Sequence, residues 1–270
     1  MSHSYTGPSF GSTGAVRAKR REDEKGLVAE ALAGQLSLER RQRIRDKALA
    51  EIPSWYSPYG QLAATIGIGV VALLLGVWEL SRLSGIRLTD YLIIPLTFVM
   101  ANFFEWRVHR DVLHRRRKLF ETLYDKHTPM HHMIYVEQDM ALRSVQEFRL
   151  VLIPAVGVLG IVVLTAPFAL AISYLWSACA GWLFLVTASL YMVSYEVLHL
   201  CYHAPHDSFI GRRRFIAAMR THHARHHNPR LMQRWNFNVI FPLADWVLGT
   251  IAPKGETPII DSQETPQTPQ

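Results

Sequence analysis

Cysteine is scarce in this chain of 270 residues, which has only Cys179 and Cys201. Two cysteines without a CxxC pair exclude a disulfide framework. The first 50 residues are polar and charged and contain no apolar stretch of the kind that a secretory signal needs, so we expect no signal peptide there. Internal repeats and a low-complexity core are also lacking. What the sequence does contain is a series of apolar blocks separated by strongly charged stretches.

Charged residues are few in four apolar blocks, at about residues 61–80, 88–106, 150–168 and 169–193. Each block approaches the roughly 20 apolar residues that cross a bilayer as a helix. The alternative is a set of buried helices in a soluble protein. Such helices usually carry a polar stripe, and blocks 61–80 and 150–168 have none. We therefore expect an all-α integral membrane protein with about four transmembrane helices.

The composition of the regions before and after the apolar blocks predicts that the chain has three parts. Residues 1–55 form a polar basic arm, which we expect to be disordered to about Arg21 and helix-compatible from Glu24 to Ile52. That helix would lie on the membrane surface or be solvated. Residues 56–252 form the membrane domain, and residues 253–270, rich in proline and threonine, form a tail that we expect to be disordered.

Lysine and arginine are distributed unevenly around the four blocks. The loop between the first two blocks carries only Arg82 and Arg87, and the expected turn between the last two, near residues 166–170, carries none. All other basic residues flank the opposite ends of the apolar blocks. Those ends and both termini should therefore be cytoplasmic. The net charge of +7 beside apolar blocks favours an anionic membrane surface over nucleic acid. We expect a bacterial inner membrane, or the endoplasmic reticulum in a eukaryote.

Twelve of the thirteen histidines fall between residues 109 and 227, and none lies in the middle of an apolar block. They form four groups, HRDVLH, HTPMHH, HLCYHAPH and HHARHH, which the charge pattern places on one face of the membrane. Residues three or four apart share a helix face, as in His199 and His203. His109 and His114, five apart, suit a helix less well, and Pro129 interrupts the second group.

Imidazole is the commonest nitrogen ligand for iron, zinc and copper. One zinc ion takes about four ligands, so ten or more histidines indicate two metal ions. A solvated surface role is the ordinary interpretation of a single histidine. Four groups on one face favour a metal centre.

The order HX4H, HX3HH, HX3H and HX2HH resembles the fatty acid hydroxylase and sterol desaturase superfamily over about residues 90–250. The stretch NFNVIFPLADWVLGT, residues 236–250, is similar to the segment after the last histidine box of that family. The second box here is HX3HH where some relatives have HX2HH. His222 offers an alternative register for the last box, because His222, His226 and His227 also form HX3HH. The resemblance implies ten metal ligands: His109, His114, His127, His131, His132, His199, His203, His223, His226 and His227.

Members of this superfamily are integral membrane enzymes with a non-haem di-metal centre, which use dioxygen and two electrons to hydroxylate or desaturate lipids. The resemblance thus implies two iron ions, which zinc can replace on purification, and no catalytic residues beyond the ligands. The polar arm is too short for a fused cytochrome b5 domain. Electrons should therefore come from a separate carrier, either cytochrome b5-like or a ferredoxin with its reductase.

Carboxylates and further histidines near the boxes are candidates for orienting the ligand rings. Each also has an ordinary interpretation as a solvated or salt-bridged surface group. The best of them is Glu196, because an unpaired charge near the inner end of a membrane block is costly. The full set is Glu196, Asp111, Asp207, Asp245, His222 and His206.

The sequence therefore predicts four membrane helices and a cytoplasmic helical cap that carries a histidine-rich di-metal site. The expected function is oxygen-dependent hydroxylation of a fatty acyl, sphingolipid or sterol-like C–H bond. Desaturation on the same scaffold is the alternative, and the residues do not separate the two. A non-enzymatic metal transporter or sensor is disfavoured, because transport sites usually lie near the bilayer midplane.

Overall fold

The computed structural model describes residues 22–253, except for residues 24, 32 and 34–35. Within this part of the chain the regular structure is helical, apart from one isolated bridge between Val136 and Asp139. The all-α prediction is confirmed. The expected disorder before residue 21 and the tail after residue 253 lie outside the described residues.

Four helical segments in the described part are long and apolar enough to cross a membrane: Pro58–Arg82, Leu88–Leu113, Val145–Leu175 and Ala178–Tyr202. The first is α3 (Pro58–Arg82), which begins where the Ser57 hydroxyl accepts from the Gly60 backbone N–H at 3.0 Å. The second joins η1 (Leu88–Leu92), α4 (Ile93–Val108) and η2 (His109–Leu113). The prediction of four such segments is confirmed.

The predicted turn at residues 166–170 is wrong. The third segment runs through η4 (Val145–Glu147), α7 (Phe148–Val151), α8 (Ala155–Leu164) and α9 (Ala166–Leu175), with only Thr165 between the last two helices. Pro167 lies in the first turn of α9, where its missing N–H costs no hydrogen bond. The chain reverses at Trp176 and Ser177, and Ser177 caps α10 (Ala178–Tyr202) by accepting from the Ala180 backbone N–H at 3.0 Å.

Helix α10 is the central helix of the spanning part and contacts α3, α4, α8 and α9. Two glycines allow α3 to approach it closely. A Cβ atom added at Gly69 would lie 3.2 Å from a methyl carbon of Val193, and one added at Gly76 would lie 2.2 Å from a methyl carbon of Val186. These contacts are typical of small residues between membrane helices, and they fix an antiparallel register between α3 and α10.

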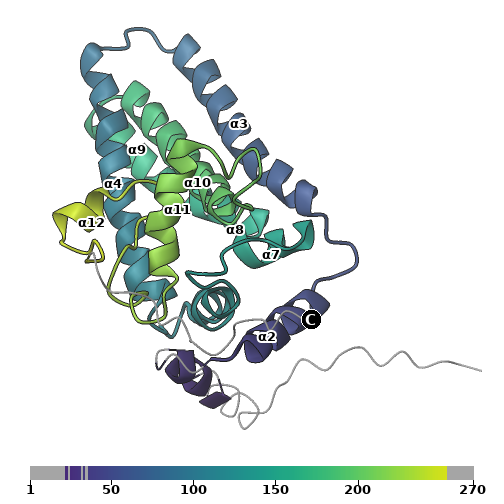
Figure 1. Ribbon diagram of the computed structural model, residues 1–270. Coiled ribbons are helices and arrows are strands. Elements are labelled where there is room, and N and C mark those ends of the chain that lie inside the picture. The colour runs from purple at the N-terminus through teal and green to yellow at the C-terminus, as the bar shows by residue number, and fades with distance from the viewer. Residues whose placement is uncertain (1–21, 24, 32, 34–35, 254–270) are drawn as a thin grey trace, which may run out of the picture.

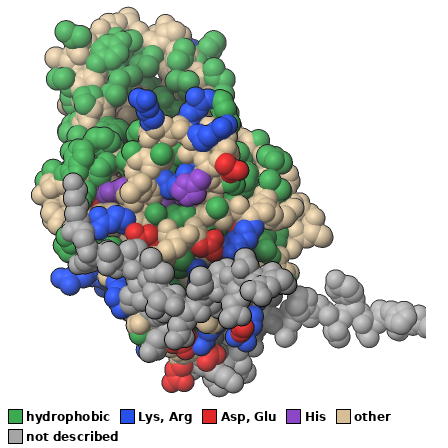
Figure 2. Space-filling view, viewed as in Figure 1, with side chains coloured by type: hydrophobic (Ala, Val, Ile, Leu, Met, Phe, Trp, Pro, Cys, Tyr) green, Lys and Arg blue, Asp and Glu red, His purple; other side chains and the backbone are tan. Residues whose placement is uncertain are grey.

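The remaining elements gather around one end of the spanning helices, in the middle and lower parts of Figure 1. Figure 2 shows the same division: the upper part of this face is mostly hydrophobic, and charged side chains collect lower down. We call this region the cap. It comprises α2 (Leu38–Ala50), α5 (Glu121–Lys126), η3 (His127–His131), α6 (His132–Ile134), α11 (Arg214–His226) and α12 (Leu243–Val247).

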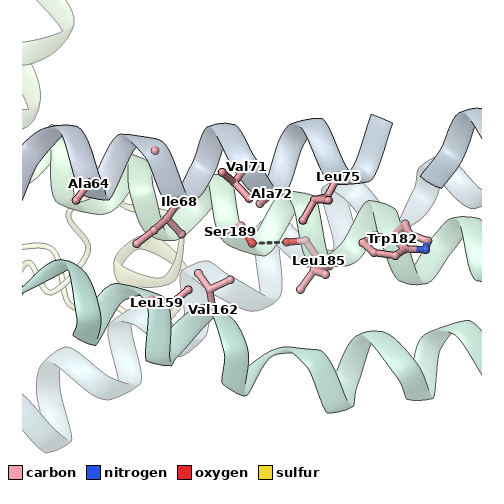
Figure 3. Close-up of a pocket in the computed structure, with 11 residues that line it drawn as sticks. Ala64, Ile68, Val71, Ala72, Leu75, Leu159, Val162, Trp182, Leu185 and Ser189 are labelled. Atoms are coloured by element: carbon pink, nitrogen blue, oxygen red, sulfur yellow. Dashed lines mark hydrogen bonds between the residues drawn. The ribbon is translucent and has the colours of Figure 1, made fainter. Parts of the chain in front are cut away.

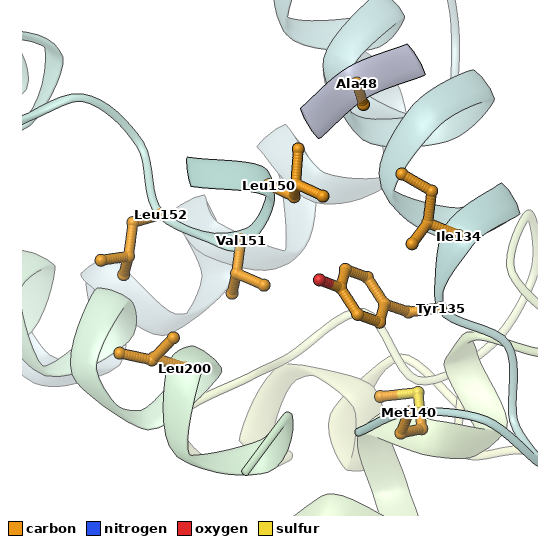
Figure 4. Packing of buried hydrophobic residues seen from close by; sticks show 8 residues of the cluster. All are labelled: Ala48, Ile134, Tyr135, Met140, Leu150, Val151, Leu152 and Leu200. Atoms are coloured by element: carbon orange, nitrogen blue, oxygen red, sulfur yellow. The ribbon is translucent and has the colours of Figure 1, made fainter. Parts of the chain in front are cut away.

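The basic arm contributes directly to the cap through α2. Ala48 of α2 packs in a buried cluster with Ile134, Tyr135, Leu150 and Leu200 (Figure 4). Arg45 of the same helix is also buried. The arm helix is therefore neither merely solvated nor confined to a membrane surface, because one face of it packs against the rest of the cap.

Candidate metal centre

Ten histidines converge in the cap and, among the described residues, form two groups of five. Within each group, the ring nitrogens that face one another all lie within 4.8 Å. The structure thus brings together all ten histidines of the box pattern. The first group is His109, His114, His127, His132 and His226, and the second is His131, His199, His203, His223 and His227.

Two π-helical turns explain the five-residue spacing in the first group. In η2 the backbone N–H of His114 donates to the carbonyl of His109 at 3.2 Å, and in η3 the N–H of His132 donates to the carbonyl of His127. A π turn places residues five apart on one side of the helix, and such turns are frequent at functional sites. The ring centroids of His109 and His114 are 5.2 Å apart, and those of His127 and His132 are 4.7 Å apart.

Adjacent histidines are divided between the two groups. Successive residues of a helix point about 100° apart, because one turn takes 3.6 residues. His131 therefore reaches the second group while His132 reaches the first, and His227 and His226 divide in the same way. His222 belongs to neither group, since its Nε2 lies 3.2 Å from Asp245 Oδ2. The last box therefore contributes His223 rather than His222.

Backbone carbonyls hold half of these rings in a defined orientation. Five Nδ1 atoms lie 2.5–3.0 Å from a carbonyl oxygen. A carbonyl oxygen only accepts, so each of these rings carries its proton on Nδ1 and a lone pair on Nε2. The pairs are His109 with Phe237, His131 with Leu150, His203 with Met140, His226 with Trp235 and His227 with Tyr135.

His114 reaches the same state through a side chain. The Thr128 hydroxyl donates to the Leu113 carbonyl at 2.7 Å, so its oxygen accepts from His114 Nδ1 at 3.2 Å. The Nε2 atoms of His114 and His226 then lie 2.9 Å apart, each with a lone pair and neither with a proton to donate. A bound cation would relieve this unfavourable contact by accepting both lone pairs.

The second group has unpaired ring nitrogens instead. The Nε2 atoms of His131, His199 and His203 are buried and have no hydrogen-bond partner. Leaving a buried polar atom unpaired is costly, and such atoms are rare in folded proteins. The Nε2 atoms of His223 and His227 lie 3.0 Å apart, close enough for one ion to bind both. The donor set of each group fits a transition-metal ion.

Burial keeps these rings neutral. Loss of solvation lowers the pKa of His131 to about 3. It also holds the pKa values of His114, His132 and His226 well below 6.5, and the neighbouring rings add to the effect. A neutral imidazole keeps the lone pair that a metal ion needs. Little histidine is visible in the space-filling view of Figure 2, in keeping with this burial.

Asp245 supports the first group through the backbone. It is buried, and its Oδ1 and Oδ2 accept from the backbone N–H groups of Phe237 at 3.0 Å and Asn238 at 2.8 Å. The carbonyl of Phe237 in turn accepts from His109 Nδ1. Asp245 thus fixes the loop that orients a candidate ligand, and it contacts no ring of the first group itself.

Three other candidate supports have partners outside the two histidine groups. Glu196 is buried, and its Oε2 accepts from the Ile153 backbone N–H at 2.7 Å. Asp111 forms ion pairs with three arginines, Arg107, Arg110 and Arg115. Asp207 and His206 are exposed, and His206 Nδ1 lies 2.9 Å from an Arg220 nitrogen.

Two residues of α4 were missed by the sequence argument although they shape the site. Glu105 is buried and accepts from the backbone N–H groups of Val239 and Ile240 and from the Tyr191 hydroxyl. Asn102 Oδ1 accepts from the Ala244 backbone N–H at 2.9 Å. Both hold the segment after the last histidine box against α4. The only signal was a carboxylate and an amide within an apolar block, where polar side chains are costly.

We expect the substitution Asp245→Asn to weaken metal binding about 10- to 100-fold, the usual effect of losing a group that supports a ligand. The amide nitrogen would face backbone N–H donors and displace the loop that orients His109. Metal retention during titration with a chelator measures the change. Asp207→Asn is the matched control, because Asp207 is exposed. Equal retention by both variants would show that the Asp245 contacts do not support the site.

Comparison with known proteins adds one finding. A family model described as fatty acid hydroxylase matches residues 94–250, more than half of the chain, and this range contains all ten histidines. No curated protein and no solved structure matches the chain.

Proposed function

Because the chain belongs to the fatty acid hydroxylase family, we propose that it is an oxygen-dependent membrane enzyme that hydroxylates a lipid C–H bond. The observation that carries this proposal is the pair of five-histidine groups at the cap-side ends of α4 and α10. Side-chain acids and bases do not break unactivated C–H bonds, so such a reaction needs a redox cofactor. When bound, two iron ions would supply the oxidant from dioxygen and two electrons. Zinc suits the same all-nitrogen ligands and can replace iron on purification.

The chain's own part in the reaction is to hold and orient the ligand rings and to shield the site from water. Backbone carbonyls fix the proton of five rings on Nδ1, which directs their Nε2 atoms inward. Nine of the ten rings belong to buried residues, so bulk water is kept from the site. The loop held by Glu105 and Asp245 closes the side next to His109.

The site's position supports a lipid substrate, because a lipid in the bilayer can reach histidines that lie at the ends of the spanning helices. We place the cap on the cytoplasmic side, because Arg82 and Arg87 are the only basic residues near the far ends of the described spans. A bacterial inner membrane is the proposed location, or the endoplasmic reticulum in a eukaryote. Electrons would come from a separate protein, cytochrome b5-like or a ferredoxin with its reductase.

The balanced reaction distinguishes the alternatives. Hydroxylation converts R–H, dioxygen, two electrons and two protons into R–OH and water. Desaturation uses the same co-reactants, removes two hydrogens from the lipid and releases two waters. A metal transporter is disfavoured, because both histidine groups lie at helix ends and transport sites usually lie near the bilayer midplane.

We expect lipid extracts of aerated cells that express the chain to contain a lipid heavier by one oxygen atom than its precursor. Mass spectrometry of cells with and without the gene checks this, and cells expressing the His226→Ala/His227→Ala variant serve as the control. A lipid lighter by two hydrogen atoms would identify a desaturase instead. An unchanged set of lipids, with metal-loaded protein present in the membrane, would contradict the proposal.

A further inference from the structure

An apolar groove lies between α3, α8 and α10, within the spanning part of the fold (Figure 3). Its volume is about 440 Å³, within the range of about 300–1,000 Å³ that is usual for ligand pockets. The close-up shows side chains of α3 facing those of α8 across it, with α10 behind. The lining includes Ala64, Leu75, Leu159, Val162, Trp182 and Ser189.

The groove is long and almost without hydrogen-bonding groups. It follows α3 from Ala64 to Leu75, about 16 Å at the helical rise per residue. The Ser189 hydroxyl donates within its own helix, to the Leu185 carbonyl at 2.7 Å. The groove therefore suits hydrocarbon, and its length along α3 suits an extended chain. Inside spanning helices, such a chain comes from a membrane lipid.

The register of α3 and α10 indicates which residues lie between the Ala64 end of the groove and the histidines. Gly69 faces Val193 and Gly76 faces Val186. The same register places Thr65, one turn before Gly69, opposite Glu196 and Val197.

Two oxygen atoms of these residues lack partners. Thr65 and Glu196 are both 0% exposed, and Thr65 Oγ1 and Glu196 Oε1 have no hydrogen-bond partner. Thr65 directly follows Ala64 at the groove's end, and Glu196 lies about one helical turn before His199. Buried unpaired oxygens at the junction between groove and metal centre indicate a polar ligand group there.

We propose that the groove binds the hydrocarbon chain of the lipid substrate, with its methyl end toward Leu75 and Trp182 and its polar end at Thr65 and Glu196. The identity of this lipid as substrate rests on the proposed function, whereas its binding does not. Gly67 lines the groove, and a Cβ atom added there would meet nothing within 4 Å. A larger side chain at Gly67 would therefore begin in open space and extend into the groove.

The test uses a straight-chain fatty acid with a photoreactive diazirine near its methyl end. Full-length protein in detergent is irradiated with this probe under argon, so that no turnover occurs, and the labelled peptides are identified by mass spectrometry. The variant is Gly67→Leu, which also improves helix propensity and so should fold. The matched control is Gly160→Leu on α8, another position with nothing within 4 Å, which is exposed and does not line the groove.

We expect the wild-type label at the Leu75 and Trp182 end of the groove. Labelling there should fall about tenfold in Gly67→Leu, the loss expected when roughly two methylene groups are no longer buried, and should stay unchanged in Gly160→Leu. Label spread over lipid-facing residues such as Leu74 and Trp78, or label in the groove unaffected by Gly67→Leu, would overturn the proposal. If labelling follows expectation but metal-loaded protein yields no oxidised lipid, the groove stands and the proposed enzymatic function fails.

Discussion

Replacement of His226 and His227 by alanine together is expected to release both metal ions from the chain, whereas either single replacement should release one. The two neighbours serve different groups, His226 the first and His227 the second. Each ring is also oriented by a backbone carbonyl, so each loss removes a prearranged ligand. Protein purified without oxygen and dialysed against a chelator should retain about two ions per wild-type chain, about one in each single variant and almost none in the double variant.

His206→Ala is the control for this experiment. His206 is exposed and lies beside Arg220, outside both groups, so its removal should leave two ions bound. Loss of both ions in each single variant would mean that the groups act as one site. A folded wild-type protein without stoichiometric metal would show that these histidines are not ligands, and the enzymatic interpretation would fall with them.

The residues that could be predicted from the sequence are those whose spacing carries geometric information. Histidines three or four apart on a helix share a face, so the pairing of His199 with His203 followed from helical geometry. The spacing of His109 and His114 looked unfavourable only because an α-helix was assumed. The π turn at η2 brings them together, and no local residue pattern specifies that turn.

Other features depend on contacts that no local pattern carries. The reversal at Trp176 was missed because residues 166–175 are apolar, uncharged and as suitable for the end of one span as for the start of another. Glu105 acts on backbone groups more than 130 positions away, so only the folded chain shows its role. The division of His131 and His132 between two groups likewise depends on where α10 and α11 lie.

A second large effect is expected at Arg45, in the part of the chain that the sequence assigned to a separate arm. Arg45 Nη1 lies 2.7 Å from Glu147 Oε2, and the two side chains are 3% and 1% exposed. The Tyr135 hydroxyl donates to the same carboxylate oxygen at 2.7 Å. Arg45→Met would leave the carboxylate of Glu147 buried without its cation. We expect the free energy of unfolding to fall by about 3–5 kcal/mol, as is typical when one partner of a buried ion pair is removed.

Unfolding in detergent micelles measures this loss, and two further variants separate its causes. Arg40→Met removes the exposed partner of Glu30, a pair with side chains 44% and 35% exposed, and should change stability by at most about 1 kcal/mol. Arg45→Met combined with Glu147→Gln removes both charges and keeps an acceptor for Tyr135. The double variant should recover most of the loss, because no uncompensated charge remains buried.

The outcome also decides where the functional domain begins. The Tyr135 carbonyl accepts from His227 Nδ1 at 2.7 Å, so Tyr135, whose hydroxyl binds Glu147, also orients a candidate ligand. If Arg45→Met destabilises the protein and lowers metal retention, α2 is part of the metal-binding cap, and a boundary near residue 55 would cut through it. If Arg45→Met behaves like Arg40→Met, α2 is dispensable for the cap and the boundary near residue 55 is right.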